Sequence, residues 1–361
     1  MSLLKLADLD HRLLHELKAL PVHRGRVLRA WLNGKALSAG PRLQPQEHFL
    51  PLTVRHGLPA LAEALDAVAQ IHSLHPGADA SMRLLVRLAD GQMIESVLLP
   101  RDGLCVSTQV GCAVGCRFCM TGKSGLIRQL SSLEIVAQVV LARRLRPVKK
   151  VVFMGMGEPA HNLDNVLEAI KLLGTEGGIG HKNLVFSTVG DRRVFELLPQ
   201  QRVRPALALS LHTTRADLRE HLLPRAPKIS PEELIDLGEA YARATGYPIQ
   251  YQWTLLKGIN DGQEELEAIL RLLKGKYAVL NVIPFNALEG TGLSADNGES
   301  YERPDAERIR EIVAWLHSRR VLTKVRNSAG QDVDAGCGQL RARAEQVVQR
   351  VRVRGENGGA A

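Results

Sequence analysis

The sequence predicts an α/β protein whose core is a partial, TIM-like (β/α)6 barrel, preceded by a small helical domain. Six short segments that are rich in β-branched residues and almost continuously apolar recur along the 361 residues. Such segments are typical of parallel strands that helices cover on both faces. No glycine-rich dinucleotide fingerprint opens the series, and this favours a barrel over an open doubly wound sheet.

The first part of the chain, residues 1–84, is predicted to form a helical accessory domain. Leucines recur there at helical spacing as far as Ile71, and prolines and glycines such as Gly40 and Pro51 separate the helices. We expect a loop at 75–79 after the last of these helices.

The second part, residues 85–340, is predicted to hold the barrel together with a β-hairpin that precedes it. Residues 82–88 and 93–99 alternate between apolar and polar side chains, and the turn Ala89-Asp90-Gly91 joins them. The barrel strands are expected at 105–109, 149–156, 182–189, 204–212, 247–256 and 278–285. Helices are expected near 131–145, 163–173, 231–244, 263–274 and 305–319.

Residues 341–361 are predicted to form a basic C-terminal tail. Arg343, Arg350, Arg352 and Arg354 lie in this stretch, which ends in glycine-rich sequence. We interpret it as a solvated, frayed helix, and an arm that contacts RNA is the alternative interpretation.

The composition is that of a soluble globular protein of the cytoplasm. Hydrophobic residues make up 45% and charged residues 24% of the chain, which excludes a mostly disordered protein. No apolar run approaches the roughly 20 residues of a membrane-spanning helix, and the N-terminus lacks the features of a secretory signal. The net charge of +9 favours an acidic partner such as nucleic acid.

The five cysteines are more informative than the charge, because three of them lie on one short loop. Cys112, Cys116 and Cys119 form a CxxxCxxC motif directly after the first expected barrel strand. Three thiolates can hold three irons of a 4Fe–4S cluster and leave the fourth iron open to a small chelating molecule, such as S-adenosylmethionine (SAM). A structural zinc site is the alternative, but it usually needs four ligands, and Cys337 is the only distant thiol that remains.

This motif, at the first strand of a six-unit α/β chain, resembles the radical SAM superfamily. A further set of motifs is similar to the RlmN/Cfr family, whose members are radical enzymes that methylate adenosine in ribosomal RNA and, in some cases, transfer RNA. The motifs are LCVSTQVGC at 104–112, VFMGMGEP at 152–159, LSLH at 209–212, IND at 259–261, IPFN at 283–286 and DAGCGQL at 334–340. A fainter likeness covers residues 20–32.

The resemblance implies that the chain is an RNA methyltransferase that uses two SAM molecules in each turnover. The first methylates Cys337 by simple displacement. The second, bound to the 4Fe–4S cluster, is cleaved by one electron to a radical that takes a hydrogen from that methyl group, and the resulting methylene radical adds to the adenine ring. Cys105 then releases the RNA and leaves a transient Cys105–Cys337 disulfide. Glu95 matches the position of the family's proton acceptor.

The resemblance also implies a SAM site at the ends of the barrel strands. Gly157 and Glu158 would hold the ammonium group of SAM, and its ribose and carboxylate would be bound by the LSLH and IPFN motifs and a serine of the third expected strand. The residues of this second set are Ser187, Ser210, Leu211, His212 and Asn286. The electron would come from a donor protein such as a flavodoxin or a ferredoxin.

Two departures from the family pattern leave the target atom open. The fifth expected strand reads Ile249-Gln-Tyr-Gln-Trp253 where a Glu is usual beside the Tyr, and Ser187-Thr-Val-Gly190 replaces a Ser-Thr-Ser-Gly pattern. We expect carbon 2 of adenosine to be the target, with carbon 8 as the alternative. A radical SAM enzyme acting on a substrate other than RNA and a zinc-stabilised RNA-binding module are the competing hypotheses.

RNA is expected to bind through charge rather than through stacking, because aromatic residues are only 4% of the chain. The candidate cations lie in the helical domain and around the first barrel helix. They are Arg24, Arg26, Arg29, Lys123, Arg128, Arg143, Arg144 and Lys149.

Overall fold

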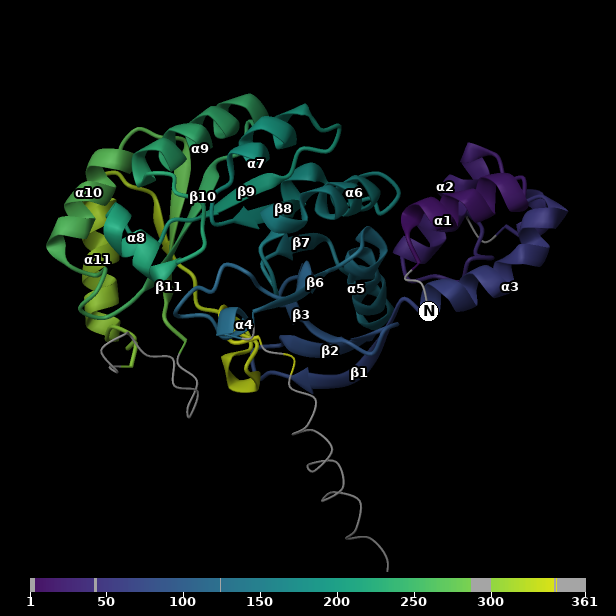
Figure 1. Ribbon diagram of the computed structural model, residues 1–361, viewed down its shortest axis with the longest axis horizontal. Helices are drawn as coiled ribbons and strands as arrows, with labels where there is room; N and C mark the ends of the chain where they lie inside the picture. The colour runs from purple at the N-terminus through teal and green to yellow at the C-terminus, as the bar shows by residue number, and fades with distance from the viewer. Residues whose placement is uncertain (1–3, 42–43, 124, 287–299, 341, 343–361) are drawn as a thin grey trace, which may run out of the picture.

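The computed structural model describes residues 4–41, 44–123, 125–286, 300–340 and 342, and its largest element is a ten-stranded sheet. The strand order is β1-β2-β3-β4-β7-β8-β9-β10-β11-β12 (Figure 1). The predicted basic tail at 341–361 lies outside the described residues, apart from Ala342.

The parallel half of this sheet confirms the predicted partial barrel. Adjacent strands from β4 to β12 run parallel, and the sheet curves so that its helices lie on the outside (Figure 1). The strands are β4 (Gly103–Cys105), β7 (Lys150–Phe153), β8 (Leu184–Thr188), β9 (Ala206–Ser210), β10 (Ile249–Leu255), β11 (Ala278–Pro284) and β12 (Thr323–Val325). The short strand β12 is an addition to the six predicted ones.

Five of the barrel helices, α5, α6, α9, α10 and α11, begin and end within one residue of the predicted bounds, whereas α7 and α8 were not predicted. The helices of the barrel half are α5 (Ser132–Leu145), α6 (Leu163–Gly174), α7 (Arg192–Leu197), α8 (Ala216–Leu222), α9 (Pro231–Thr245), α10 (Gln263–Leu273) and α11 (Ala306–Ser318). Single helical turns in this half are η4 (Pro159–Asn162), η5 (His181–Asn183), η6 (Leu198–Gln200) and η7 (Gln331–Val333). Capping residues set the starts. Ser131 accepts a hydrogen bond from the backbone N–H of Glu134, whose carboxylate accepts one from the Ser131 N–H.

The antiparallel half of the sheet contains one strand that the sequence analysis missed. The predicted hairpin is confirmed as β2 (Met82–Leu88) and β3 (Met93–Leu99). However, β1 (Ala69–Pro76) pairs with β2, so the expectation of helices up to Ile71 was wrong, and the loop expected at 75–79 begins only at Gly77. After the buried Ala69, side chains along β1 alternate between exposed and half-buried, as on an edge strand with one solvated face.

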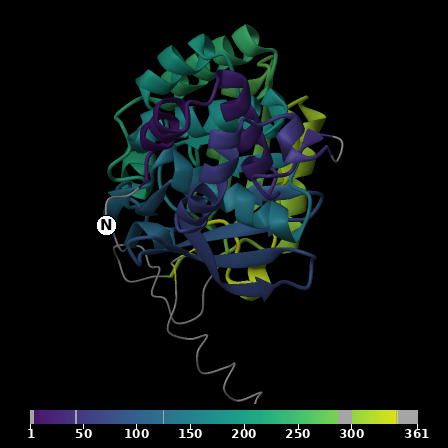
Figure 2. The ribbon, with the colours of Figure 1, turned by 90° about the vertical axis from the view of Figure 1, so that its right-hand side faces the viewer.

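The N-terminal helices form a bundle beside the barrel and end at Asp66. They are α1 (Leu6–His11), the π-helical turn η1 (Arg12–Glu16), α2 (Pro21–Leu32), η3 (Gln46–His48) and α3 (Leu52–Asp66). Helix α2 packs on α5, and in Figure 2 the bundle faces the viewer in front of the barrel. Buried leucines of the bundle, such as Leu28 and Leu61, belong to the same apolar cluster as the barrel core.

The first barrel strand ends earlier than predicted. A strand was expected at 105–109, but β4 stops at Cys105. The chain then passes Ser107, whose N–H donates to the side chain of Gln138 at 2.8 Å, and begins a separate two-stranded sheet, β5 (Gln109–Gly111) with β6 (Leu126–Gln129). Helix α4 (Met120–Lys123) lies between these two strands.

None of the described helices is both long enough and apolar enough to cross a membrane.

Candidate active site

The three-cysteine loop leaves β5 through a position that only glycine can occupy. Gly111 has φ +80°, and a Cβ at this residue would lie 2.0 Å from the carbonyl oxygen of Gly125. The N–H of Cys112 donates to that same oxygen at 2.9 Å. The loop therefore begins at a fixed point of the small sheet, and its cysteines follow from there.

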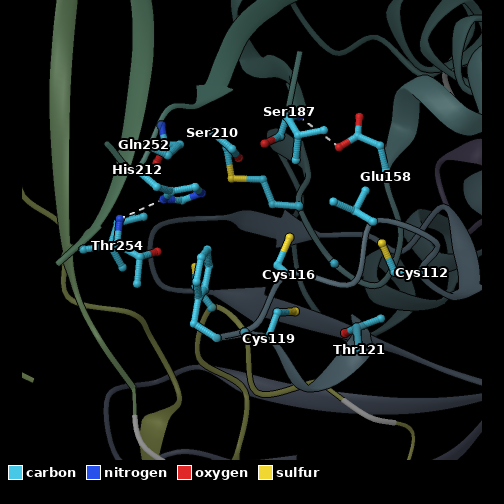
Figure 3. A pocket seen from close by; sticks show the side chains of 18 of the residues that line it. Cys112, Cys116, Cys119, Thr121, Glu158, Ser187, Ser210, His212, Gln252 and Thr254 are labelled. Carbon is cyan, nitrogen blue, oxygen red and sulfur yellow. Dashed lines mark hydrogen bonds between the residues drawn. The ribbon is translucent and has the colours of Figure 1, made fainter. Parts of the chain in front are cut away.

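Cys112, Cys116 and Cys119 line one pocket at the carboxyl ends of the barrel strands (Figure 3). All three thiols are free. Burial raises the pKa of Cys112 to about 12, and the neighbouring Cys119 sulfur adds to this increase. Burial also raises the pKa of Cys119. Thiols in such surroundings are stabilised as thiolates by bound metal.

The donor set of this pocket consists of three cysteine thiols from one loop. In the described part of the chain, no three His, Cys, Asp or Glu side chains are placed so that they could hold a metal ion. A zinc ion, with sulfur ligands at about 2.3 Å, would draw its thiolates to within about 4 Å of one another. An iron–sulfur cube binds each thiolate to a different iron and so holds them farther apart. Three thiols from one loop can hold three irons of such a cluster and leave the fourth iron open.

Contacts on two sides hold the cysteine loop in place. On the α8 side, the Arg117 side chain donates to the carbonyl oxygen of His221 at 2.7 Å. On the other side, the Met120 N–H donates to the Gly338 oxygen at 2.8 Å, and the Thr121 hydroxyl donates to the Leu340 oxygen at 2.7 Å. The second pair of contacts brings Cys337 to the cysteine loop, although the two are far apart in sequence.

Gly157 and Glu158 lie beside the loop, as predicted. Gly157 has φ +106°, and a Cβ there would approach the Gln109 side chain to 2.6 Å, so the chain can pass this point only with glycine. The buried carboxylate of Glu158 accepts hydrogen bonds from the N–H groups of Ala160 and Val189, each at 3.0 Å. Burial raises the pKa of Glu158 to about 7. A cationic ligand group in this pocket would find a fixed acceptor there.

His212 has a fixed and neutral ring. Its Nδ1 accepts a hydrogen bond from the Thr254 N–H at 3.0 Å (Figure 3), which leaves the ring proton on Nε2. Burial, with a smaller contribution from Arg219, lowers the pKa of His212 to about 3. The backbone of His212 has φ +63°, in the left-handed region that residues other than glycine uncommonly adopt. His212 can therefore act as a hydrogen-bond donor but not as an acid at neutral pH.

Ser187, Ser210 and Asn286 complete the predicted polar lining of the pocket. The Asn286 amide donates to the carbonyl oxygen of Cys337 at 3.1 Å and to the Ser328 hydroxyl at 2.9 Å. Its Oδ1 is buried and has no hydrogen-bond partner among the residues that the structure describes. A buried acceptor of this kind normally has a partner, so it indicates that a ligand donates to it.

Cys105 and Cys337 come together at the opposite wall of the site. Both line a second cavity, which occupies the lumen of the partial barrel, and Cys337 lines the first pocket as well. Burial, followed by the proximity of Cys337, raises the pKa of Cys105 to about 12. Cys337 itself is exposed. The two mechanistic thiols of the prediction therefore face the same space.

Leu211 and Glu95 are the two predicted site residues that line neither cavity. The Leu211 side chain is buried in the core. Glu95 is buried on β3, where its carboxylate pairs with Arg83 and accepts a hydrogen bond from the Ala342 N–H at 3.0 Å.

Two arginines of the site were not found by sequence analysis. Arg326, which follows β12, lines both cavities and donates to the Gln252 side chain at 3.2 Å. Arg219 is buried, and its side chain donates to the carbonyl oxygens of Val189 and Ser210. Neither belongs to a motif that the sequence analysis singled out, so only the fold could reveal them.

Several of the predicted RNA-binding cations are neutralised within the protein. They form ion pairs with nearby acids, which are Arg24 with Asp10, Arg128 with Asp90 and Glu134, Arg144 with Asp66, and Lys149 with Asp102. Arg143 donates to backbone carbonyl oxygens, including that of Leu32 at 2.8 Å. Most of this set therefore stabilises the fold instead of presenting free positive charge.

Known proteins resemble this chain over nearly its whole length. Residues 106–273 match the model of the radical SAM superfamily. A protein of Bordetella avium is 73% identical over 97% of both chains, and one of Stutzerimonas stutzeri is 71% identical over 97% of this chain and all of its own. Both are named as probable RNA methyltransferases. The crystal structure of a radical SAM methyltransferase from Sphaerobacter thermophilus is 33% identical, with a TM-score of 0.79 over 94% of this chain and 98% of its own.

Proposed function

The chain belongs to the radical SAM superfamily, and we propose that it methylates carbon 2 of an adenosine in RNA, with Cys337 as the methyl carrier. Membership of the superfamily implies a 4Fe–4S cluster and SAM. An RNA substrate is supported by the names of relatives that are 67–73% identical over most of the chain. Ribosomal RNA is the RNA class that we propose, with transfer RNA as a second substrate.

The observation that carries this proposal is the position of Cys337 between the two cavities. It lines the pocket of the three loop cysteines and also the lumen cavity that contains Cys105. A thiol that receives a methyl group from SAM and then delivers a carbon to a base must reach both ligands. A radical enzyme that acts directly on its substrate needs no further thiol at this point, and a zinc site closed by Cys337 would have no use for Cys105 beside it.

Residues around the pocket would hold SAM against the cluster cysteines. Glu158 would bind the ammonium group, and the unpaired Asn286 Oδ1 would accept a hydrogen bond from the ligand. Ser187, Ser210 and the Nε2–H of His212 supply further neutral hydrogen-bonding groups. When bound, the cluster and SAM would supply the one-electron chemistry that removes a hydrogen atom from the methyl group of Cys337.

The methyl group reaches Cys337 by nucleophilic displacement. The thiolate of Cys337 attacks the sulfonium methyl of SAM, and S-adenosylhomocysteine leaves with the electron pair of the broken carbon–sulfur bond. The exposure of Cys337 supports this step, because the thiolate must be formed and must be accessible. Gly336 and Gly338 flank it, and Gly338 has φ +84°.

Cys105 would release the methylated base. The adduct first loses the proton of the ring carbon and gives up its unpaired electron to a one-electron acceptor, such as the oxidised form of the electron donor. The Cys105 thiolate then attacks the sulfur of Cys337 and forms a disulfide. The electron pair of the broken carbon–sulfur bond stays on the transferred carbon, which takes up a proton and becomes the methyl group. A thiol reductant then restores both cysteines. Glu95 is proposed to take the proton from the ring carbon, and it lies two residues before Val97, the cross-strand partner of Cys105. The cytoplasm suits this cycle, since its thiols are kept reduced, and a flavodoxin or ferredoxin would supply the electron.

The test is the isotope content of the product formed from SAM with a fully deuterated methyl group. RNA is incubated with the reconstituted protein and a reductant, and its nucleosides are analysed by mass spectrometry. Transfer through Cys337 predicts 2-methyladenosine with two deuterium atoms, because one is lost to the radical. Three deuterium atoms would show direct methyl transfer and would overturn the mechanism, and 8-methyladenosine would overturn the choice of carbon. Unmodified RNA would overturn the assignment of RNA as substrate.

A further inference from the structure

The lumen of the partial barrel carries a cluster of positive charge outside the SAM pocket. Four cations line the cavity, and they come from separate segments of the chain. Arg101 lies in the turn between β3 and β4, Lys150 begins β7, Lys324 is in β12 and Arg326 follows it. The same cavity contains Cys105 and Cys337.

The positive charge of these four side chains is not offset by ion pairs with the acids that the structure describes. Within the described ranges, no ion pair joins any of them to an Asp or a Glu, whereas the adjacent Lys149 pairs with Asp102 at 2.8 Å. Asp79, the one acidic residue among the described residues of the lining, accepts hydrogen bonds from the N–H groups of Ser81 and Gly330. The other polar lining residues near the cations include the neutral amides Gln250 and Asn281.

The cations also face one another. The pKa of Lys150 is lowered, first by burial and then by the charges of Arg326, Arg101 and Lys324. Such mutual repulsion is unfavourable unless an anion is present to offset it. Folding has nevertheless gathered all four around one cavity.

The turn that carries Arg101 has an uncommon backbone. Arg101 and Asp102 have φ values of +59° and +60°, in the left-handed region that side chains other than glycine rarely adopt. The Asp102 carbonyl oxygen accepts hydrogen bonds from the N–H groups of Lys149 at 2.9 Å and Lys150 at 3.2 Å. The turn and the first residue of β7 are thereby fixed to each other, and conformational strain of this kind is concentrated at functional sites.

We propose that the lumen is a phosphate-binding subsite for the backbone of the RNA strand at the target nucleotide. Gly103 pairs with Lys150, and Cys105 pairs with Val152. Lys150 is therefore two residues, or about 7 Å, below the level of Cys105 along the strands. A nucleotide whose phosphate lies among the cations can place its base beside Cys105 and Cys337. This inference rests on the proposed function, because it takes the acceptor to be RNA.

Arg326 would connect the subsite to the chemistry. It lines both cavities, and its Nη1 is held by the Gln252 oxygen at 3.2 Å. Its guanidinium is therefore fixed at the boundary between SAM and the nucleotide. Because the target base must leave its stack to reach Cys337, a fixed phosphate contact would help to hold it in the extruded position.

The test compares the binding of RNA to two double variants that lose the same charge. Lys150→Ala/Lys324→Ala removes two cations from the lumen, and Lys149→Ala/Lys228→Ala removes two exposed lysines that pair with acids outside it. The probe is a short, fluorescent, single-stranded oligoribonucleotide that contains adenosine, and anisotropy gives its affinity over a range of salt concentrations. For single strands, each lost phosphate contact reduces the salt slope by about 0.7.

The lumen variant should bind RNA at least about tenfold more weakly at low salt and with a shallower salt slope, while the control variant should match the wild type. Lys150→Arg/Lys324→Arg should restore binding, which separates loss of charge from misfolding. Equal affinities and slopes for the lumen and control variants would overturn the inference. SAM-dependent methylation of Cys337 is measured in parallel. If the wild-type protein is methylated and binds RNA, and the lumen variant binds RNA equally well, the result contradicts the subsite alone. A wild type that does neither contradicts the proposed function.

Discussion

The backbone N–H of Met120 donates a hydrogen bond to the carbonyl oxygen of Gly338 at 2.8 Å. This contact joins the residue after Cys119 to the residue after Cys337. The carbonyl oxygen of Cys337 is in turn held by the Asn286 amide at 3.1 Å. The proposed methyl carrier is therefore fixed on one side to the cluster loop and on the other to the SAM pocket, while its thiol stays exposed.

Replacing Cys105 with alanine should trap the RNA on the protein. In the proposed cycle, the Cys105 thiolate breaks the bond that joins Cys337 to the transferred carbon, and no other described cysteine outside the cluster loop could replace it. Cys105→Ala should therefore accumulate a covalent protein–RNA adduct, visible as a shifted band in a denaturing gel. Cys105→Ala/Cys337→Ala is the control and should form none. Free RNA only, with the single variant, would contradict the release role.

Replacing Glu95 with glutamine should also slow release, whereas replacing Arg83 should not. Both Glu95→Gln and Arg83→Gln break the buried ion pair between these residues. Each should lower the free energy of unfolding by about 3–5 kcal/mol, because the remaining charge is left unpaired. Only the first removes the proton acceptor. At a temperature where both variants are folded, the adduct should accumulate with Glu95→Gln alone. Equal adduct levels would assign Glu95 a purely structural role.

The stability of the metal-free protein should fall below pH 6.5 because of His212. Its folded-state pKa of about 3 lies below the ordinary histidine value of 6.5, so in acid the unfolded chain binds a proton that the folded protein does not. The loss amounts to at most about 1.4 kcal/mol for each pH unit between 6.5 and 3. His212→Asn, which tolerates the left-handed backbone, should weaken this dependence. Urea denaturation at pH 7 and pH 5 measures both slopes, and identical slopes would refute the prediction.

Much of the fold follows from local sequence signals. The capping pair Ser131 and Glu134 and the helical periodicity after it fixed the start of α5, and the turn at Asp90-Gly91 fixed the hairpin. Strand β1 was missed because its alternating side chains directly follow helix α3 with no glycine or proline between them, and the pairing with β2 decides its structure. Strand β12 is three residues long and has no apolar run that could predict it.

The site could be predicted where residues belong to motifs and not where it depends on tertiary contacts. The loop cysteines, Glu158 and His212 carry recognisable spacing, and the structure brings them to one pocket. Arg326 and Lys324 look like ordinary charged residues near the end of the chain. They gain a role only because β12 pairs with β11 and closes one side of the lumen.

The central claim, that Cys337 carries the methyl group, is tested most directly by mass spectrometry of the peptide that contains it. The protein is reconstituted anaerobically with iron and sulfide, incubated with SAM and a reductant in the absence of RNA, and digested. We predict one additional methyl group on Cys337 and none on Cys105. In the Cys112→Ala variant, whose cluster is disrupted, we predict no methyl group on Cys337. A Cys337 peptide that stays unmethylated in the wild-type protein, although its cluster is fully assembled, would contradict the account.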